Sequence, residues 1–180
     1  MGVLSKKICT IGDFGVGKTS LIRRYVEGVF SDEYLSTVGV KVSQKLLEID
    51  PESDREAIQL KLMIWDLEGH TRFKPIAKSY LQGASGALIV ADLTRPETLD
   101  NLNDRLQLFL SVNPKGVVAI ALNKLDLAMT EKLDDSSSFS RWNDERIISF
   151  NFTSAKLGDN VEKIFQDLSI GIVTQAYHSN

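Results

Sequence analysis

Eight residues from Gly12 to Thr19 have the types and the spacing that phosphate binding requires. They read Gly-Asp-Phe-Gly-Val-Gly-Lys-Thr and fit the pattern G-x-x-x-x-G-K-[ST]. In this pattern the glycines let backbone N–H groups converge on phosphate oxygens, and the following helix adds its positive N-terminus. The motif predicts that Lys18 bridges the β- and γ-phosphates and that Thr19 offers its hydroxyl to Mg²⁺. The competing interpretation is a glycine-rich turn without a ligand.

A carboxylate for the other side of the metal follows the apolar run Leu62–Trp65. Asp66 closes that run, and we predict that it holds Mg²⁺ through water. Gly69 comes three residues later, and the absence of a Cβ lets its backbone N–H approach the γ-phosphate. Taken alone, an aspartate at the end of a strand is more often a turn residue. The phosphate motif is what makes a functional role for Asp66 the better interpretation.

The segment Asn123-Lys124-Leu125-Asp126 follows another apolar run, over residues 117–122. It is therefore predicted to lie at the carboxyl edge of a sheet, where ligands bind in open α/β folds. The carboxylate of Asp126 would accept hydrogen bonds from N1–H and the exocyclic amine of guanine, which adenine does not offer at those positions. A solvated turn is the plain alternative for such residues. Combined with the phosphate motif, the segment predicts selection of guanine over adenine.

The elements that must position these residues alternate between strands and helices. Residues 87–91 and 117–121 are continuous apolar runs, typical of parallel strands covered on both faces. Residues 38–48 and 57–66 flank a cluster of turn residues and predict an antiparallel hairpin. The fold class is α/β, a mostly parallel six-stranded sheet with one antiparallel edge strand and helices on both faces. We further predict a strand at 7–11, helices at 18–28, 99–110 and 161–172, and a loop with a short helix within 127–146.

Composition bounds the class of protein. The 180 residues are 43% hydrophobic with a net charge of −3, which predicts one domain over 1–180 and no binding to nucleic acid. The lone cysteine, Cys9, and the lack of a signal sequence or spanning segment predict a cytoplasmic location. Lys6 stands where a myristoylation signal has serine or threonine, and the last residues include no prenylation cysteine. No lipid anchor is evident, and we expect a monomer.

Jointly, these motifs make the chain resemble a small GTPase of the Ras superfamily, with the P-loop NTPase fold, and the Rab branch is the nearest fit. The resemblance spans nearly the whole chain and includes Leu21 to Tyr25, Thr37 to Val40, Arg72-Phe73 and Thr153 to Lys156. It implies GTP or GDP and Mg²⁺ as ligands. The nucleotide-binding residues that it implies are Gly12, Asp13, Gly15, Val16, Gly17, Lys18, Thr19, Ser20, Phe30, Tyr34, Thr37, Gly69, Asn123, Lys124, Asp126, Ser154, Ala155 and Lys156.

The same resemblance assigns individual roles. Ala155 supplies a backbone N–H to guanine O6, Ser154 and Lys156 support the base pocket, and Lys124 packs along the base. Phe30 lies against the base edge, and Tyr34 lies over the phosphates. Thr37 joins Thr19 and Asp66 at the metal, and it holds its loop closed only while the γ-phosphate is present. Residues 30–41 and 67–80 would then change order with the nucleotide and bind effectors, exchange factors and GTPase-activating proteins.

Three departures from the family pattern concern hydrolysis. His70 stands where family members usually carry the glutamine that orients the attacking water, and a neutral imidazole can still hydrogen-bond to water. Phe14 stands where a small residue is usual and would crowd the γ-phosphate. Leu67-Glu68 replaces Thr-Ala and places an acid near the phosphates. The predicted catalytic residues are His70, Lys18 and Thr37.

Three hypotheses for function follow from these motifs. The first is a GTP/GDP switch that hydrolyses GTP slowly, assisted by an activating protein. The second, suggested by Phe14, Glu68 and His70, is a module that stays loaded with nucleotide and hardly hydrolyses it. The third is a P-loop ATPase or nucleotide kinase, which would have to prefer ATP despite Asp126.

Overall fold

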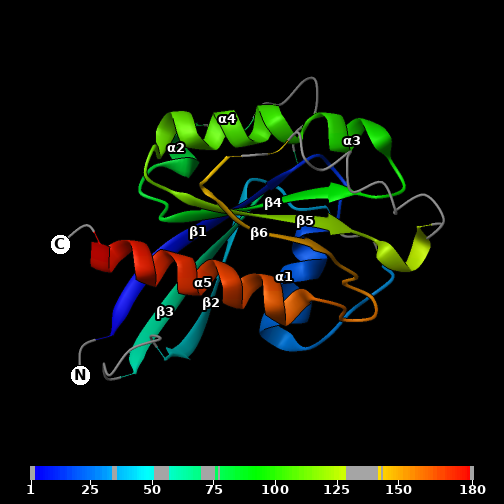
Figure 1. The fold of residues 1–180 in the computed structure, drawn as a ribbon. Coiled ribbons are helices and arrows are strands. Elements are labelled where there is room, and N and C mark those ends of the chain that lie inside the picture. The colour runs from blue at the N-terminus through cyan, green and yellow to red at the C-terminus, as the bar shows by residue number, and fades with distance from the viewer. Residues whose placement is uncertain are drawn as a thin grey trace.

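Six strands form one sheet that separates two layers of helices (Figure 1). The structure, a computed structural model, describes residues 3–33, 36–50, 57–69, 76, 78–128, 142 and 144–178. The strand order is β2-β3-β1-β4-β5-β6, with β2 antiparallel to β3 and all other pairs parallel. The predicted fold class is confirmed. The strands are β1 (Leu4–Gly12), β2 (Val40–Ile49), β3 (Ile58–Leu67), β4 (Gly86–Asp92), β5 (Val117–Asn123) and β6 (Ile147–Phe152).

The helices cover both faces of the sheet. On one face lie α1 (Lys18–Glu27) and α5 (Val161–His178), and on the other lie α2 (Lys78–Leu81), α3 (Pro96–Asp100) and α4 (Leu102–Val112) (Figure 1). A short 3₁₀ turn, η1 (Leu125–Leu127), follows β5. Within the described residues, no helix is both long and apolar enough to cross a membrane.

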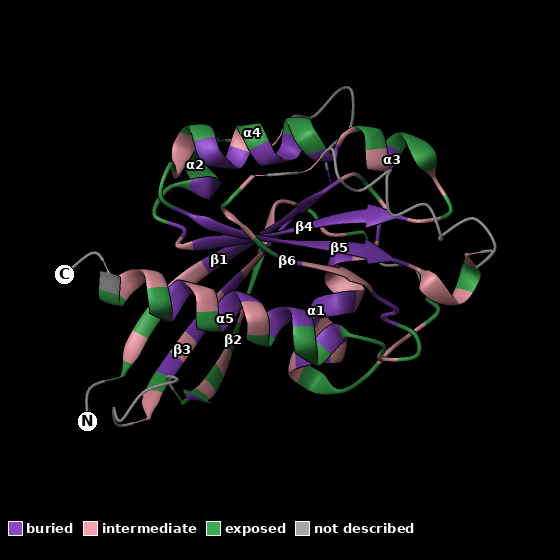
Figure 2. Cartoon of the chain, in the orientation of Figure 1, coloured by how far each residue is buried: buried purple, intermediate pink, exposed green. Residues whose placement is uncertain are grey.

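The burial of the two central strands explains why their sequences are apolar throughout. Every residue of β4 and β5 is buried, and Figure 2 shows these strands as buried along their length. Because side chains alternate between the faces of a strand, Leu88 and Val90 pack with α1 and α5, while Ala87, Ile89 and Ala91 pack with α4. A strand covered on both faces has no exposed positions to fill with polar residues, which accounts for the continuous apolar runs.

Two regions differ from the predicted elements. The helix predicted over 99–110 is two helices, α3 and α4, which meet at Asn101. No residues were assigned to the sixth strand from the sequence, because β6 is an edge strand with polar Ser149 and Asn151 and little alternation in burial. Residues 51–56, which include most of the predicted turn of the hairpin, and most of 129–143 lie outside the described residues.

The parallel strands place their carboxyl ends at one edge of the sheet. Gly12, Asp66, Asp92 and Asn123 end or nearly end β1, β3, β4 and β5. The loops that leave these strands therefore meet at the same edge, at the right of Figure 1. Every predicted ligand-binding motif begins there, as expected for an open α/β sheet.

The fold predicts an unreactive thiol at Cys9. Its side chain is fully buried between β1 and the α2–α4 layer, and burial raises the pKa of the thiol to about 11. Because the thiolate is the reactive form, labelling at pH 8 should be at least about a hundredfold slower in the native protein than after denaturation. A colorimetric disulfide reagent with and without denaturant measures this. Rapid labelling of native protein would contradict the packing around β1.

Candidate functional site

The loop between β1 and α1 is wrapped around a cavity. Gly15 and Gly17 have positive φ angles, 76° and 99°, which favour glycine. A Cβ on Gly17 would come within 2.3 Å of Asn123 Nδ2, and a Cβ on Gly12 within 2.4 Å of the Val90 carbonyl oxygen. These glycines therefore allow the loop to pack directly against β4 and the segment after β5, so that its backbone amides can curve around a ligand.

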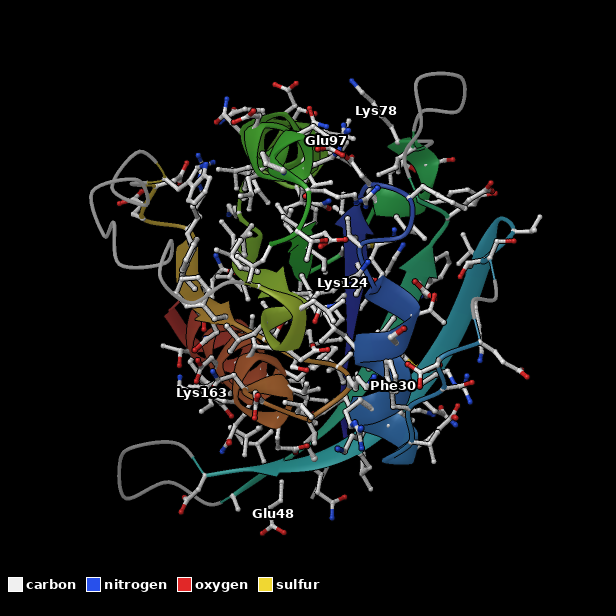
Figure 3. All side chains as sticks on the ribbon, turned by 90° about the vertical axis from the view of Figure 1, so that its right-hand side faces the viewer. Phe30, Glu48, Lys78, Glu97, Lys124 and Lys163 are labelled. Atoms are coloured by element: carbon white, nitrogen blue, oxygen red, sulfur yellow. The ribbon has the colours of Figure 1, made fainter. Side chains whose placement is uncertain are left out.

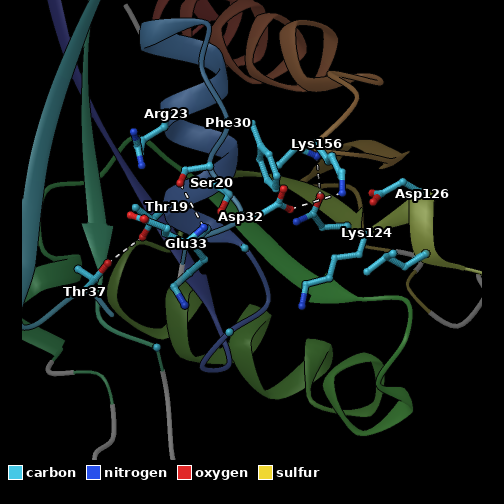
Figure 4. A pocket seen from close by; sticks show the side chains of 18 of the residues that line it. Thr19, Ser20, Arg23, Phe30, Asp32, Glu33, Thr37, Lys124, Asp126 and Lys156 are labelled. Atoms are coloured by element: carbon cyan, nitrogen blue, oxygen red, sulfur yellow. Dashed lines mark hydrogen bonds and ion pairs between the residues drawn. The ribbon is translucent and has the colours of Figure 1, made fainter. Parts of the chain in front are cut away.

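The cavity has a volume of about 360 Å³ and opens at the carboxyl edge of the sheet (Figure 4). Among the predicted residues, Gly12, Asp13, Val16, Asp66 and Ser154 belong to the adjoining segments without lining it. Tyr34 and His70 lie outside the described residues. The predicted residues that line it are Gly15, Gly17, Lys18, Thr19, Ser20, Phe30, Thr37, Gly69, Asn123, Lys124, Asp126, Ala155 and Lys156.

Lys18 is a buried cation at the floor of this cavity. Only 6% of the residue is exposed, and its ammonium donates to the carbonyl oxygens of Gly12 (3.1 Å) and Asp13 (3.0 Å). Burial lowers the pKa of Lys18 to about 8, although the nearby carboxylates of Asp66 and Asp13 oppose this shift. Two carbonyls satisfy donors without neutralising a buried charge. The geometry therefore fits an anion bound next to Lys18.

Three oxygen-bearing side chains converge beside Lys18. Thr19 Oγ1 lies 2.7 Å from Thr37 Oγ1 (Figure 4). It also donates to Asp66 Oδ2 (2.6 Å), and Thr37 Oγ1 is 3.4 Å from the same carboxylate oxygen. Burial raises the pKa of Asp66 despite these hydrogen bonds, so a cation beside it would relieve an unfavourable charge. Hydroxyl and carboxylate oxygens are hard donors, and one carboxylate is what Mg²⁺ typically takes from a protein. The donor set fits Mg²⁺.

Asn123 joins the phosphate loop to the base-side loop. Its Nδ2 donates to the Val16 carbonyl (2.9 Å), and its Oδ1 accepts from Thr153 Oγ1 and from the Ala155 N–H, both at 3.2 Å. Asp126 accepts a hydrogen bond from Ser154 Oγ at 2.6 Å. The structure thus brings together the two motifs predicted to read guanine, one after β5 and one after β6.

Lys124 and Phe30 flank the same part of the cavity. Figure 3 labels both on the face toward which the strand ends point. Lys124 has a left-handed backbone (φ 67°), and its ammonium lies 2.7 Å from the fully buried carboxylate of Asp92. Burial alone would raise the pKa of Asp92, but hydrogen bonds from Lys124 and Thr94 outweigh it and hold that pKa below its usual value. Asp92 therefore holds the Lys124 side chain in place through its ammonium, a role that was not predicted from the sequence.

Arg24 on α1 is a second residue whose role was missed. Its guanidinium donates to the Ala155 carbonyl (2.8 Å), the Gly28 carbonyl (3.2 Å) and the Lys156 carbonyl. One side chain therefore ties both walls of the base side together, because Gly28 begins the loop that carries Phe30. The helical spacing of apolar residues predicts α1 but says nothing about a polar position beside them, so only the charge at Arg24 hinted at such a contact.

The phosphate loop is also anchored from the other helical layer. Asp13 accepts from Arg105 Nη2 (2.8 Å) and Asn101 Nδ2 (2.7 Å), while Arg95 donates to the Phe14 carbonyl (2.7 Å). Arg105 is only 8% exposed and lies on the apolar face of α4. In the sequence, a charged residue at an apolar position of the helix is the sign that it has a buried partner.

The segments predicted to switch contribute two further features. Gly69 is buried so close to Phe14 that a Cβ would lie 2.5 Å from the Phe14 Cα. On the outer surface, Val38, Val42 and Tyr80 are 81%, 46% and 40% exposed, and Trp65 lies half-buried, paired with Val42 across the hairpin. Lys7 contacts both the Trp65 ring and the Tyr80 carbonyl, so Trp65 and Tyr80 lie close to each other.

Comparison with known proteins identifies the family. The Ras family model matches residues 7–174. The chain is 33% identical over 171 residues to the Ras-related protein Rab-30 of Homo sapiens, and equally to that of Bos taurus. Each alignment covers 94% of this chain and 81% of the relative. The chain therefore belongs to the Ras family and is a Rab-like small GTPase.

Proposed function

We propose that the chain is a switch that binds GTP or GDP together with Mg²⁺ and hydrolyses GTP slowly. The observation that carries this proposal is the buried Lys18 ammonium next to the Thr19, Thr37 and Asp66 oxygens. Lys18 and the amides of the Gly12 to Ser20 loop hold the β- and γ-phosphates, and Thr19, Thr37 and Asp66 hold the metal. Mg²⁺ would stabilise negative charge that develops on the transferring phosphate.

The base-side loops select guanine in this proposal. The Asp126 carboxylate accepts from the guanine N1–H and amine, while Ser154 holds the carboxylate in place. Lys124 and Phe30 pack on the base, and the Ala155 N–H, which donates to Asn123 in the structure, turns to guanine O6. Lys156 closes the mouth of the cavity through its contact with Asp32 (3.4 Å; Figure 4).

The patch formed by Val38, Val42, Trp65 and Tyr80 is the proposed contact surface for effector, exchange-factor and GTPase-activating proteins. It lies next to both predicted switch segments, so a structural change at the γ-phosphate would be transmitted to it over a short distance. Lys7 steadies the patch, because its ammonium lies 3.8 Å from the centre of the Trp65 ring and donates to the carbonyls of Tyr80 and Gln82.

Replacing Asp126 by asparagine tests base selection. The new amide offers one donor and one acceptor, which suits the N1–H and C2 carbonyl of xanthine but leaves a guanine donor unpaired. We expect the affinity for GDP to fall by about a hundredfold or more and binding of xanthosine diphosphate to appear, both measured by fluorescence titration. Unchanged GDP affinity would remove Asp126 from the base site.

Replacing Arg24 by methionine tests the anchoring of the base-side loops. Loss of its charged hydrogen bonds to three carbonyls should accelerate GDP dissociation by roughly tenfold or more. Arg24→Lys should restore slow GDP dissociation only in part, because an ammonium cannot form the paired hydrogen bonds of a guanidinium. Lys163→Met, which removes a lysine that pairs with Asp167 on α5, is the matched control. Equal dissociation rates in all four proteins would show that Arg24 has no such role.

Single-turnover hydrolysis separates the slow switch from the module that stays loaded. The alternative, a module that stays loaded with nucleotide, is supported by the crowding of Gly69 against Phe14 and by the departures from the family pattern at Glu68 and His70. We expect a GTP cleavage rate clearly above that of Lys18→Ala, and His70→Ala should lower it by about tenfold or more if the imidazole orients water. His178→Ala, at the other histidine of the chain, is the control. A wild-type rate equal to the background would leave only the loaded module.

A further inference from the structure

The β2–β3 hairpin continues one pair beyond its last strand residues. The ladder ends with Val40 opposite Leu67, and beyond it the Glu68 N–H donates to the Gly39 carbonyl at 2.9 Å. The Gly39 N–H does not return to the Glu68 backbone. It donates to the side-chain carboxylate, Glu68 Oε2, at 2.9 Å. Gly39 and Glu68 are therefore joined by two hydrogen bonds, one of them to a charged acceptor.

The backbone of Gly39 makes this arrangement possible. Its φ is 71°, in the left-handed region that glycine adopts without strain. This turn of the chain directs the N–H toward the carboxylate. A hydrogen bond to an ionised acceptor is roughly twice as strong as one between neutral groups. An alanine at position 68 would keep the backbone contact and lose the stronger one.

The joined pair lies next to two residues that are predicted to contact the metal and the phosphates, Thr37 and Gly69. Two residues before Gly39, Thr37 lies at the Thr19 and Asp66 oxygens. With Gly39 fixed, the Cα of Thr37 can move only within about 7 Å of it, the reach of two extended residues. On the other side, Gly69 follows Glu68 and packs on the Phe14 backbone. Both contacts of the pair are between protein atoms, and neither of them uses an atom of the nucleotide.

We propose that Glu68 is a positioning residue that joins residues 36–39 to residues 67–69 and keeps Thr37 at the metal site with GDP as well as with GTP. This inference rests on the proposed nucleotide-binding function and deepens it. In the usual switch, Thr37 is held through the γ-phosphate and its loop is released when that phosphate is lost. Here the carboxylate of Glu68 supplies a second anchor for the same loop, through the Gly39 N–H.

The exchange rate of the Gly39 amide proton tests this directly. It is measured by NMR on ¹⁵N-labelled protein with Mg²⁺ and either GDP or a non-hydrolysable GTP analogue. In the wild type we expect the rates in the two states to agree within about threefold. In E68A the rate with GDP should rise roughly ten- to a hundredfold, and the analogue should restore much of the protection. E68Q should retain most of the protection with GDP, because its amide oxygen still accepts the hydrogen bond.

Glu48→Ala is the matched control, since it removes the same charge from the exposed far end of the hairpin (Figure 3) and should leave Gly39 unchanged. Wild-type Gly39 that exchanges with GDP as fast as in E68A, or about tenfold faster with GDP than with the analogue, would overturn the proposal. The wild-type comparison decides the question even if E68A does not fold. Nucleotide released from the same samples is quantified separately, so failure to bind GDP would count against the proposed function and not against Glu68.

Discussion

The buried ammonium of Lys18 is the constraint on which the site depends. A lone charge in a protein interior is costly unless it is paired. Among the described residues, Lys18 donates its hydrogen bonds to two uncharged groups, the carbonyls of Gly12 and Asp13. Its lowered pKa shows the same effect. Phosphate oxygens would neutralise this charge and accept hydrogen bonds from the neighbouring amides, while the oxygens around Asp66 would hold a Mg²⁺ ion beside them. Phosphate binding is therefore the arrangement that resolves the electrostatics of the loop.

Holding Lys18 in that place requires anchors from the whole edge of the sheet. Asn123 connects the phosphate loop to the segment after β5 by a hydrogen bond, and Arg105 on α4 donates to Asp13 in the same loop. On the base side, Arg24 and Asp92 hold the loops and lysine that would enclose guanine. These contacts join loops that are distant in the chain, so a ligand meets a cavity whose walls are already placed. Such preorganisation reduces the entropy lost on binding.

The sequence predicted the fold and the binding motifs because their signals are local. Buried parallel strands need uninterrupted apolar runs, and a tight phosphate loop needs glycines, so both can be read from a few consecutive residues. The anchors could not be predicted, because each acts on a residue far away in the chain: Arg24 on Ala155 (131 positions), Asp92 on Lys124 (32) and Arg105 on Asp13 (92). Strand β6 and the break at Asn101 were missed for a related reason. Their positions depend on neighbours in space, and their own residues carry weak patterns.

Glu68 has a different role in the structure from the one that the sequence suggests. From the sequence, it is an acid placed near phosphates, where repulsion is expected. In the structure its carboxylate accepts a hydrogen bond from the Gly39 N–H, so Glu68 links two loops. Phe14 retains its importance, because its backbone lies directly under Gly69.

The central claim is that this cavity holds a guanine nucleotide. The most direct test is to denature freshly purified protein and identify what it releases by ion-exchange chromatography. The structure predicts GDP or GTP in near-equimolar amount. Release of ADP or ATP, or no nucleotide together with no uptake of added GDP in the presence of Mg²⁺, would contradict the account.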